Sequence, residues 1–548
     1  MSYVLPLAAF MARVEASPEA PYLHQPREGQ WQTYSYYDVE QQARRIATGL
    51  QDQGYAIGDR IAILAKNSAE WVIADIAIMM AGMISVPIYA TAGTDTIDYV
   101  LKHSEAKALF VGKLDSADAL SAITSSITTI GFPYPSVSSD LQWNHWLETY
   151  APCERVAEPD PDDILTLVYT SGSTGFPKGV VLTHKNIAAG VIGANNLFES
   201  GHNSVLSYLP MAHITERSVV GMGSFYRSLE IFFNDSLETF VDDLHHAKVT
   251  LFISVPRLWL KFRSQILSVI PDEQLQLMLE SGQKDAVIAQ IRSKLGFSHC
   301  KTFGSGSAPI SKELLVWFER LGIEIGEGWG MTETSGIGCS NAPFISGDLG
   351  TIGRPLQGLD MSLSDEGEIL IRGDSIFEQY YLNEEATTEA FADGWFKTGD
   401  KGEFTGSRAV RIIGRVKEQF KTAKGKYVSP VPIESKLSAC GLVEQACVVG
   451  SGLPQPIALI VLADNVSKNS TEVTGTLDVL LQDVNTGLEG HQKLDALLLV
   501  EDAWTIESGL LTPTLKLKRS AIEARYQRLW QGNPLKGVCT EEASTETV

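Results

Sequence analysis

The sequence is poor in cysteine and in positive charge. Its 548 residues include six cysteines, and no two of them form a Cys-x-x-Cys pair. Such sparse cysteines exclude a disulfide scaffold and argue against a zinc ribbon or a redox motif, so we expect a reducing, intracellular location. Basic residues number 44 against 66 acidic ones, which gives a net charge of −22. A surface of that sign repels phosphate backbones, so we expect no nucleic-acid partner.

A targeting signal and a clear membrane anchor are missing too. The first residues, MSYVLPLAAFMARVEAS, carry no basic residue before their apolar stretch, which argues against a signal peptide. The apolar run at residues 71–90 is long enough to span a bilayer. The alternative is a buried helix, a stop at Gly82 and a short strand ending at Pro87. Asp75 inside the run and the glycine and proline after it favour this buried helix and strand.

Short apolar runs alternate with helical patterns in the first part of the chain. The runs at residues 60–66, 84–89, 108–112 and 164–170 are typical of strands, and helical patterns separate the first three. This β-α-β order predicts an α/β fold with a parallel sheet covered by helices. The net charge divides unevenly, with −20 in residues 1–414 and −2 in residues 415–548. This shift predicts a domain boundary between 414 and 415.

The clearest chemical motif is the loop YTSGSTGFPKG at residues 169–179. Its hydroxyls can donate to phosphate oxygens, its glycines permit close backbone approach, and Lys178 adds a positive charge. The strand at 164–170 leads into it, so the loop lies at the carboxyl end of a strand, where α/β proteins bind ligands. No Gly-Lys-Ser/Thr closes it, so it is not a Walker A loop. We interpret it as a phosphate-binding loop rather than a surface turn.

The segment YTSGSTGFPKGVVLTHKN resembles the AMP-binding signature of the adenylate-forming superfamily. Further motifs resemble those of that superfamily in the same order: LPMAHITER (209–217), GSGSAPI (304–310), GWGMTET (328–334), GWFKTGD (394–400), GRVKEQFKTAKGKYVSPVPIE (414–434) and LTPTLKLKR (511–519). The resemblance implies a large N-terminal domain (1–414) and a small, mobile α+β C-terminal domain (415–548). It implies a reaction in two halves, formation of an acyl-adenylate from ATP and transfer of the acyl group to a thiol.

The resemblance implies a set of nucleotide-binding residues. Around the phosphates they are Thr170, Ser171, Gly172, Ser173, Thr174, Gly175 and Lys178, and around the adenine they are Gly306, Ser307, Ala308, Gly328, Trp329, Gly330, Met331 and Thr332. Thr170 and Glu333 are expected to hold Mg²⁺, a hard cation suited to one carboxylate and phosphate oxygens. Asp400 is expected to accept the ribose hydroxyls, with Arg415 assisting at the ribose or the phosphate.

The resemblance also implies residues that act in the reaction. Lys516 is expected to bridge the substrate carboxylate and the α-phosphate, and Lys417 to be the hinge of the small domain. His213 has the position of a gate near the acyl site, although a structural histidine stays the alternative. Without the resemblance, the residues around Lys516 indicate only a solvated basic patch, and Trp329 only a core residue.

The choice of acid rests on four segments: LPMAHITER, ISVPRLW, KTAKGKYVSPVPIE and LTPTLKLKR resemble the long-chain fatty acyl-CoA synthetases. The expected substrates are therefore a fatty acid, ATP and coenzyme A, and residues 219–233 are expected to form a wall of an acyl tunnel. A ligase for a carrier-protein thiol or an aromatic acid is the alternative, and a non-catalytic nucleotide-binding protein is a third. We expect a cytoplasmic protein; peripheral contact with the inner face of a membrane and a homodimer are left open.

Overall fold

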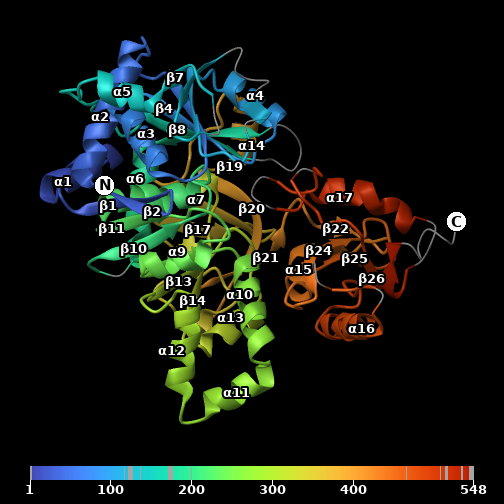
Figure 1. The fold of residues 1–548 in the computed structure, drawn as a ribbon. Coiled ribbons are helices and arrows are strands. Elements are labelled where there is room, and N and C mark those ends of the chain that lie inside the picture. Colours follow the sequence, from blue (N-terminus) through green and yellow to red (C-terminus); the bar gives the residue numbers. More distant parts are fainter. Residues whose placement is uncertain are drawn as a thin grey trace.

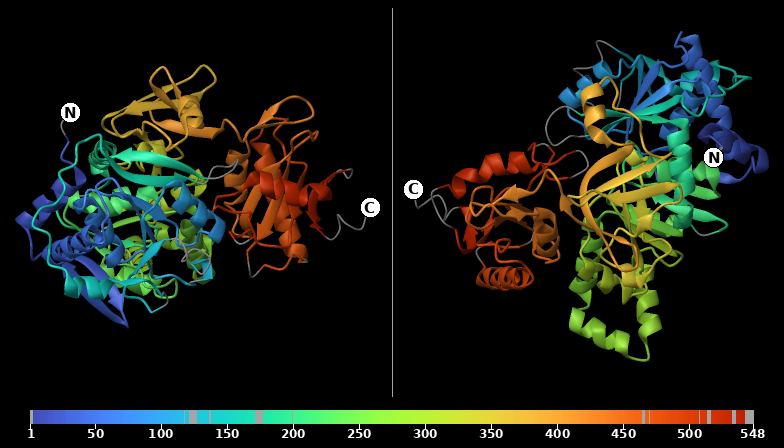
Figure 2. Two further views of the ribbon diagram at one scale, coloured as in Figure 1. Left: turned by 90° about the horizontal axis from the view of Figure 1, so that it is seen from above. Right: turned by 180° about the vertical axis from the view of Figure 1, so that it is seen from behind.

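The computed structural model describes residues 3–116, 118–120, 127–135, 138–170, 177–198, 200–463, 466–468, 470–506, 508–512, 516–531 and 535–541. Figure 1 shows a large body built from the N-terminal three quarters of the chain and a smaller C-terminal body beside it, and Figure 2 shows the same separation from two further sides. The expected division into a large α/β domain and a small one is confirmed. The expected boundary at 414/415 stays a prediction.

In the described part of the chain, seven strands form the first sheet. Their spatial order is β7 (Leu141–Gln142), β6 (Thr128–Gly131), β5 (Ala108–Gly112), β3 (Arg60–Ala65), β4 (Ile84–Ile88), β8 (Ile164–Thr170) and β9 (Lys178–Thr183). Neighbouring strands are parallel except β8 and β9, which run antiparallel. The predicted parallel sheet is confirmed, and β9 adds an antiparallel edge that the β-α-β order did not predict.

Helices cover both faces of this sheet because its strands are apolar on both sides. Along β3, Ile61 and Ile63 join the core that contains α2 (Tyr36–Asp52) and α3 (Ala69–Met80). Ala62 and Leu64 face the other way and pack in a second core with α4 (Thr94–His103). The side-chain alternation of a strand thus builds two cores from one apolar run.

The apolar run at residues 71–90 folds as the buried helix α3 followed by strand β4. Every residue of α3 is buried, and the chain turns at Gly82 with a φ of 68° before β4 begins. The interpretation as helix, stop and strand is therefore confirmed. None of the helices in the described ranges combines the length and apolarity that a bilayer crossing requires.

Two further sheets complete most of the large body. One has the order β10 (Asn203–Ser207), β11 (Leu229–Phe233), β1 (Pro21–Arg27), β2 (Gln30–Ser35); the other has β12 (Leu251–Ser254), β13 (Thr302–Ser305), β14 (Ile325–Trp329), β15 (Cys339–Ser340), β16 (Arg354–Pro355). Parallel pairing of β13 and β14 brings Ser305 opposite Glu327. The two motifs expected around the adenine therefore emerge side by side from neighbouring strands.

A fourth sheet links the two bodies. It contains β17 (Leu359–Leu363), β18 (Glu368–Gly373), β20 (Trp395–Phe404) and β19 (Phe391–Ala392), and β21 (Val410–Arg415) pairs with β20. In this pairing Asp400 lies opposite Arg415. The strand that carries the expected ribose residue thus leads directly to the start of the small body.

The small body is a mixed sheet with helices on both faces. After the hairpin β22 (Phe420–Lys421) and β23 (Tyr427–Val428), the strand order is β24 (Val443–Val449), β25 (Ile457–Leu462), β26 (Ala496–Leu499), β27 (Gly537–Thr540). Alternate residues of β25 enter a core with α15 (Pro430–Leu437) and α16 (Thr471–Thr486), or one with α17 (Arg519–Tyr526). The expected α+β character of this part is confirmed.

The remaining described helices connect these layers. They are α1 (Pro6–Ala16), α5 (Trp143–Thr149), α6 (His184–Gly193), α7 (Ile214–Glu216), the π-helix η3 (Arg217–Met222), α8 (Gly223–Tyr226), α9 (Phe240–Ala247), α10 (Pro256–Val269), α11 (Asp272–Glu280), α12 (Lys284–Lys294), α13 (Lys312–Glu319) and α14 (Glu384–Ala390), with short 3₁₀ turns at Asp118–Leu120, Ala194–Leu197, Thr332–Thr334, Ser346–Asp348 and Gln527–Leu529. The six cysteines, all within the described ranges, are free, in line with the absence of a disulfide scaffold.

Candidate active site

The expected phosphate loop connects the antiparallel strands β8 and β9. Thr170 is the last residue of β8 and Lys178 the first of β9, and the two lie opposite each other in the ladder. The expected phosphate ligands between them, Ser171, Gly172, Ser173, Thr174 and Gly175, lie outside the described residues. The hairpin therefore places the hydroxyl-bearing Thr170 and the cationic Lys178 together at one end of the first sheet.

Lys178 and Glu333 meet at the same tyrosine. The Lys178 Nζ lies 4.8 Å from the centre of the Tyr380 ring. The Tyr380 hydroxyl donates a 2.8 Å hydrogen bond to Oε1 of Glu333. Burial raises the pKa of Tyr380, and the Glu333 carboxylate raises it further, so the phenol stays a donor at neutral pH. The sequence did not single out Tyr380, because one tyrosine in a segment with several aromatic residues carries no local signal.

These side chains fit the magnesium ion that the resemblance implies. Glu333 offers a carboxylate and Thr170 a hydroxyl, and both are the hard oxygen ligands that Mg²⁺ prefers. In the described ranges no group of three or more His, Cys, Asp or Glu side chains forms a metal cage. A site of few protein ligands is typical of Mg²⁺ that is held together with substrate phosphates.

The motif GWGMTET folds back on itself next to the expected adenine loop. A side chain at Gly330 would put its Cβ 2.4 Å from the carbonyl oxygen of Gly336, so only glycine permits this approach. In the loop after the neighbouring strand β13, Ser307 holds a left-handed φ of 66° and is exposed, as is Ala308. A left-handed backbone in a residue with a side chain is uncommon and often marks a functional loop.

Asp400 is buried at 3% exposure and held by two partners. The indole Nε1 of Trp329 donates to its Oδ2 at 2.8 Å, and Nε of Arg415 contacts its Oδ1 at 2.8 Å. Burial raises the pKa of Asp400, while Arg415, Trp329 and Lys516 oppose that rise. The expected adenine residue Trp329 therefore orients the expected ribose residue, and stacking of its ring on a base stays a prediction.

Lys516 reaches this site from the small body. Its backbone N–H donates to the Thr512 hydroxyl at 3.1 Å, and the neighbouring Leu517 bridges to Leu511. Although Lys516 is solvent-accessible, desolvation by the protein around it lowers the pKa of its ammonium, and repulsion from Arg415 lowers it further. Attraction by Asp400 and Glu333 opposes this shift. Lys516 is thus coupled electrostatically to both the expected ribose residue and the expected metal ligand.

His213 also interacts electrostatically with Lys516. Burial lowers the pKa of His213 to about 4, with repulsion from Lys516 contributing, so the ring is neutral at pH 7. Its Nδ1 accepts the backbone N–H of Thr215 at 3.3 Å and caps α7. In this neutral tautomer Nε2 carries the proton, so that nitrogen can act as a donor. The structural and the gating interpretations are compatible, since one nitrogen caps the helix and the other is left for the site.

The expected hinge residue lies where the chain passes between the bodies. Lys417 is exposed in the turn after β21. Just before it, the N–H of Val416 donates to the Gly399 carbonyl at 2.8 Å. Just after it, the Gln419 amide donates to the Ser429 hydroxyl at 2.6 Å. Val416 is therefore tied to the large body and Gln419 to the small one, with Lys417 between them.

Comparison with known proteins agrees with this arrangement. The family model described as AMP-binding enzyme matches residues 10–381, and the model of the AMP-binding enzyme C-terminal domain matches residues 417–529. The chain is 31% identical to the long-chain-fatty-acid–CoA ligase FadD15 of Mycobacterium bovis, over 91% of this chain and 92% of that one. It is 30% identical to the peroxisomal long chain acyl-CoA synthetase 7 of Arabidopsis thaliana, over 92% and 83%.

The fold also matches a solved structure, the adenylation domain of a carboxylic acid reductase from Segniliparus rugosus in complex with AMP and a carboxylic acid. The two superpose with a TM-score of 0.80 at 21% sequence identity. The match covers 96% of this chain and 94% of that domain, and it shows the same fold. Family models over most of the chain, relatives at 30% identity or more over nine tenths of it, and the ordered motifs agree. The chain therefore belongs to the AMP-binding enzymes of the adenylate-forming superfamily.

Proposed function

We propose that the protein is an ATP-dependent long-chain fatty acid–CoA ligase that forms an acyl-adenylate and transfers the acyl group to coenzyme A. The observation that carries the proposal is the arrangement of charged residues from separate motifs. Tyr380 contacts both Lys178 and the Glu333 carboxylate, and Arg415 pairs with the buried Asp400. Lys516 of the small domain interacts electrostatically with Asp400 and Glu333, so it adds the cation that adenylate formation requires.

The first half-reaction joins two anions, a carboxylate and the α-phosphate of ATP. Positive charge must offset their repulsion and stabilise the pentavalent phosphorus. We assign this role to Lys178 on the phosphate loop and to Lys516 opposite it. Mg²⁺, held by Thr170 and Glu333 together with the phosphates, supplies further charge neutralisation when it is bound. Asp400, oriented by Trp329 and Arg415, accepts the ribose hydroxyls.

The second half-reaction needs a different surface of the small domain at the same carbonyl. We propose that the small domain rotates about Lys417 once the adenylate has formed, which withdraws Lys516 and admits the coenzyme A thiol. The separate anchoring of Val416 and Gln419 supports a hinge at this position. AMP then leaves as the acyl-CoA forms, and pyrophosphate is the product of the first step.

A fatty acid is the acid that the sequence and the relatives favour. Its tail needs an apolar wall, and each buried CH₂ contributes about 0.8 kcal/mol. Within residues 219–233, Val219, Val220, Met222 and Phe225 are buried, and the segment begins within the π-helix η3, a rare form that is frequent at functional sites. The relatives named as long-chain-fatty-acid–CoA ligase and long chain acyl-CoA synthetase support the same substrate class.

Product analysis with acids from C2 to C20 tests the proposal. We expect release of pyrophosphate with fatty acids and formation of long-chain acyl-CoA only when coenzyme A is present. Pyrophosphate release without acyl-CoA formation would favour the second candidate, a ligase for a carrier-protein thiol. Turnover of aromatic acids alone would favour an aromatic-acid ligase, and no release with any acid would leave only a non-catalytic nucleotide-binding protein.

We also propose where the protein is located and what it contacts: a cytoplasmic location, peripheral contact with the inner face of a membrane, and a homodimer. Co-sedimentation of the full chain with anionic and neutral lipid vesicles tests the membrane contact. Light scattering across a range of concentrations tests the dimer. Because the large domain carries most of the net charge of −22, we expect little electrostatic attraction to anionic vesicles.

A further inference from the structure

Tyr380 joins two expected parts of the active site that lie far apart in the sequence. Its hydroxyl donates to Oε1 of Glu333 at 2.8 Å, and its ring lies under the Lys178 ammonium at 4.8 Å. Tyr380 itself is buried at 8% exposure and packs on Phe377, with ring centres 4.7 Å apart. One rigid side chain therefore contacts both the carboxylate and the cation.

The segment that carries Tyr380 is fastened to the strand that carries Lys178. The Tyr381 N–H donates to the Gly179 carbonyl at 2.7 Å, and the Val181 N–H donates to the Gln379 carbonyl at 3.2 Å. Tyr380 forms an antiparallel bridge with Val180 between these bonds. The tyrosine backbone is thus paired with the edge of β9.

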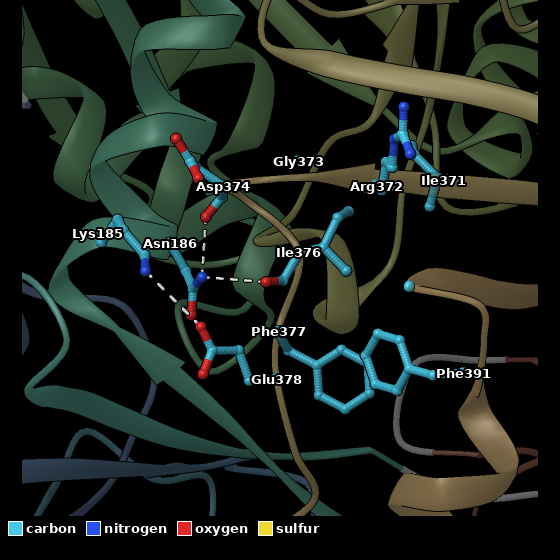
Figure 3. Close-up of a pocket in the computed structure, with 11 residues that line it drawn as sticks. Lys185, Asn186, Ile371, Arg372, Gly373, Asp374, Ile376, Phe377, Glu378 and Phe391 are labelled. Atoms are coloured by element: carbon cyan, nitrogen blue, oxygen red, sulfur yellow. Dashed lines mark hydrogen bonds and ion pairs between the residues drawn. The ribbon is translucent and has the colours of Figure 1, made fainter. Parts of the chain in front are cut away.

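The same segment is also fastened to the turn that carries Glu333. The Phe377 N–H donates to the main-chain carbonyl of Glu333 at 2.9 Å. The start of the segment lines a pocket of about 160 Å³, shown in Figure 3, where the Asn186 amide donates to the carbonyls of Asp374 at 2.9 Å and Ile376 at 3.0 Å. The position of Tyr380 is therefore determined from both ends of the segment.

We propose that Tyr380 is a positioning residue for nucleotide binding, which fixes the Glu333 carboxylate through its hydroxyl and the Lys178 ammonium through its ring. The inference rests on the proposed function, in which Glu333 binds the metal and Lys178 the phosphates. Among the described residues no other side chain bonds to the Glu333 carboxylate, so Tyr380 alone orients it there and leaves Oε2 for the metal. A partner that orients a metal-binding carboxylate typically changes metal affinity by about 10–100-fold.

Two variants separate the two contacts. Tyr380→Phe removes the hydroxyl and keeps the ring, and Tyr380→Leu removes both. The dissociation constant of ATP is measured by calorimetry without acid, so that no turnover occurs, once in saturating Mg²⁺ and once in EDTA. We expect Tyr380→Phe to weaken ATP binding about tenfold in Mg²⁺ and less than twofold in EDTA. Tyr380→Leu should weaken binding in EDTA as well, because Lys178 loses the ring beneath it.

The neighbouring tyrosine provides a matched control. Tyr381→Phe removes a hydroxyl from the same segment, on a ring that lies against His103 with centres 5.8 Å apart, and should bind ATP like the wild type in both conditions. Thermal unfolding of each variant checks that the fold is retained. Wild-type affinity of Tyr380→Phe in Mg²⁺, or an equal loss in Mg²⁺ and EDTA, would overturn the positioning role.

Glu333→Gln distinguishes this inference from the proposed function. If Mg²⁺ no longer strengthens ATP binding in Glu333→Gln but still strengthens it fully in Tyr380→Phe, only the role of Tyr380 is wrong. If Mg²⁺ strengthens ATP binding in Glu333→Gln as much as in the wild type, the metal site of the proposed function is wrong, and the positioning role is overturned with it. In the double variant we expect little loss beyond that of Glu333→Gln alone, since both changes act on one contact.

Discussion

The guanidinium of Arg217 binds the carboxylate of Asp75 through two hydrogen bonds inside the large domain. Nε donates to Oδ2 at 2.9 Å and one terminal nitrogen donates to Oδ1 at 2.7 Å. Arg217 also donates to the hydroxyls of Thr166 and Ser85. Arg217 is 2% and Asp75 4% exposed. The pair joins the motif that carries His213 to the buried helix α3. Arg217, the last residue of LPMAHITER, therefore stabilises the fold.

Removing one member of this pair should destabilise the protein strongly. Arg217→Met leaves the Asp75 carboxylate buried and unpaired, which typically costs about 3–5 kcal/mol. Urea unfolding measures the loss. The double variant Arg217→Met/Asp75→Asn carries no buried charge and should recover much of the stability. A single variant as stable as the double one would contradict the assignment.

A buried carboxyl beside this pair predicts a pH-dependent stability. Burial raises the pKa of Glu216 from 4.5 to about 8, although the Ser207 hydroxyl bonds to it and opposes the rise. Unfolded chains lose this proton near pH 4.5 and the folded one near pH 8, so the stability from Glu216 is fully present below pH 4.5 and is lost as the pH rises through 8.

Glu216→Gln cannot ionise and should remove this dependence. Relative to the wild type, we expect the variant to gain on the order of 1–4 kcal/mol between pH 5 and pH 8. Urea unfolding at the two pH values measures the difference. Glu366→Gln, at an exposed turn position, is the control and should show no such gain. A constant difference for Glu216→Gln across this range would refute the prediction.

Lys516→Ala should separate the two half-reactions. In the proposed mechanism the Lys516 charge stabilises the attack of the carboxylate on the α-phosphate, so adenylate formation should fall on the order of 10²–10³-fold. Thioesterification of supplied acyl-adenylate should fall far less, because the proposed rotation of the small domain then turns Lys516 away. Pyrophosphate release and acyl-CoA formation from the adenylate measure the two steps. Equal losses in both would argue against the assignment.

Lys417→Pro should impair the rotation of the small domain. Proline fixes φ and restricts the residue before it, so a hinge at this position loses the freedom it needs. We expect adenylate to accumulate on the enzyme while acyl-CoA formation slows, which rapid quenching and chromatography detect. Lys424→Pro, in the β22–β23 hairpin of the small domain, is a comparison outside the hinge. Unaltered partitioning in Lys417→Pro would show that the hinge lies elsewhere.

Much of the fold was predictable from local patterns. The strands at 60–66, 84–89, 108–112 and 164–170 and the helix at the start of the apolar run formed as expected, because hydrophobic periodicity and glycine or proline stops act over a few residues. The antiparallel return of β9 was not predicted. It depends on the pairing of Thr170 with Lys178 across a loop, which no periodicity reports.

For the candidate site, the motifs nominated Lys178, Glu333, Asp400 and Lys516, since the family resemblance lies in short ordered segments. The contacts that support these residues were not predicted, even where the motifs included a partner such as Trp329. Tyr380 bonds Glu333 across 47 residues, and Arg217 binds Asp75 across 142. The indole of Trp329 reaches Asp400 across 71 residues. A hydrogen bond between such distant positions depends on which strands pair and which side chains become buried together.

Residue order alone therefore established the α/β class, the two-part division and the chemistry expected of each motif, because these follow from patterns that are contiguous in the chain. The packing of the folded chain determined which other side chains orient the site residues of these motifs. Burial makes an unpaired charge or hydroxyl costly, so Asp75, Asp400 and Glu333 take the donors that the folded chain brings to them. Those donors come from other layers of the molecule, and only the complete fold brings them into contact.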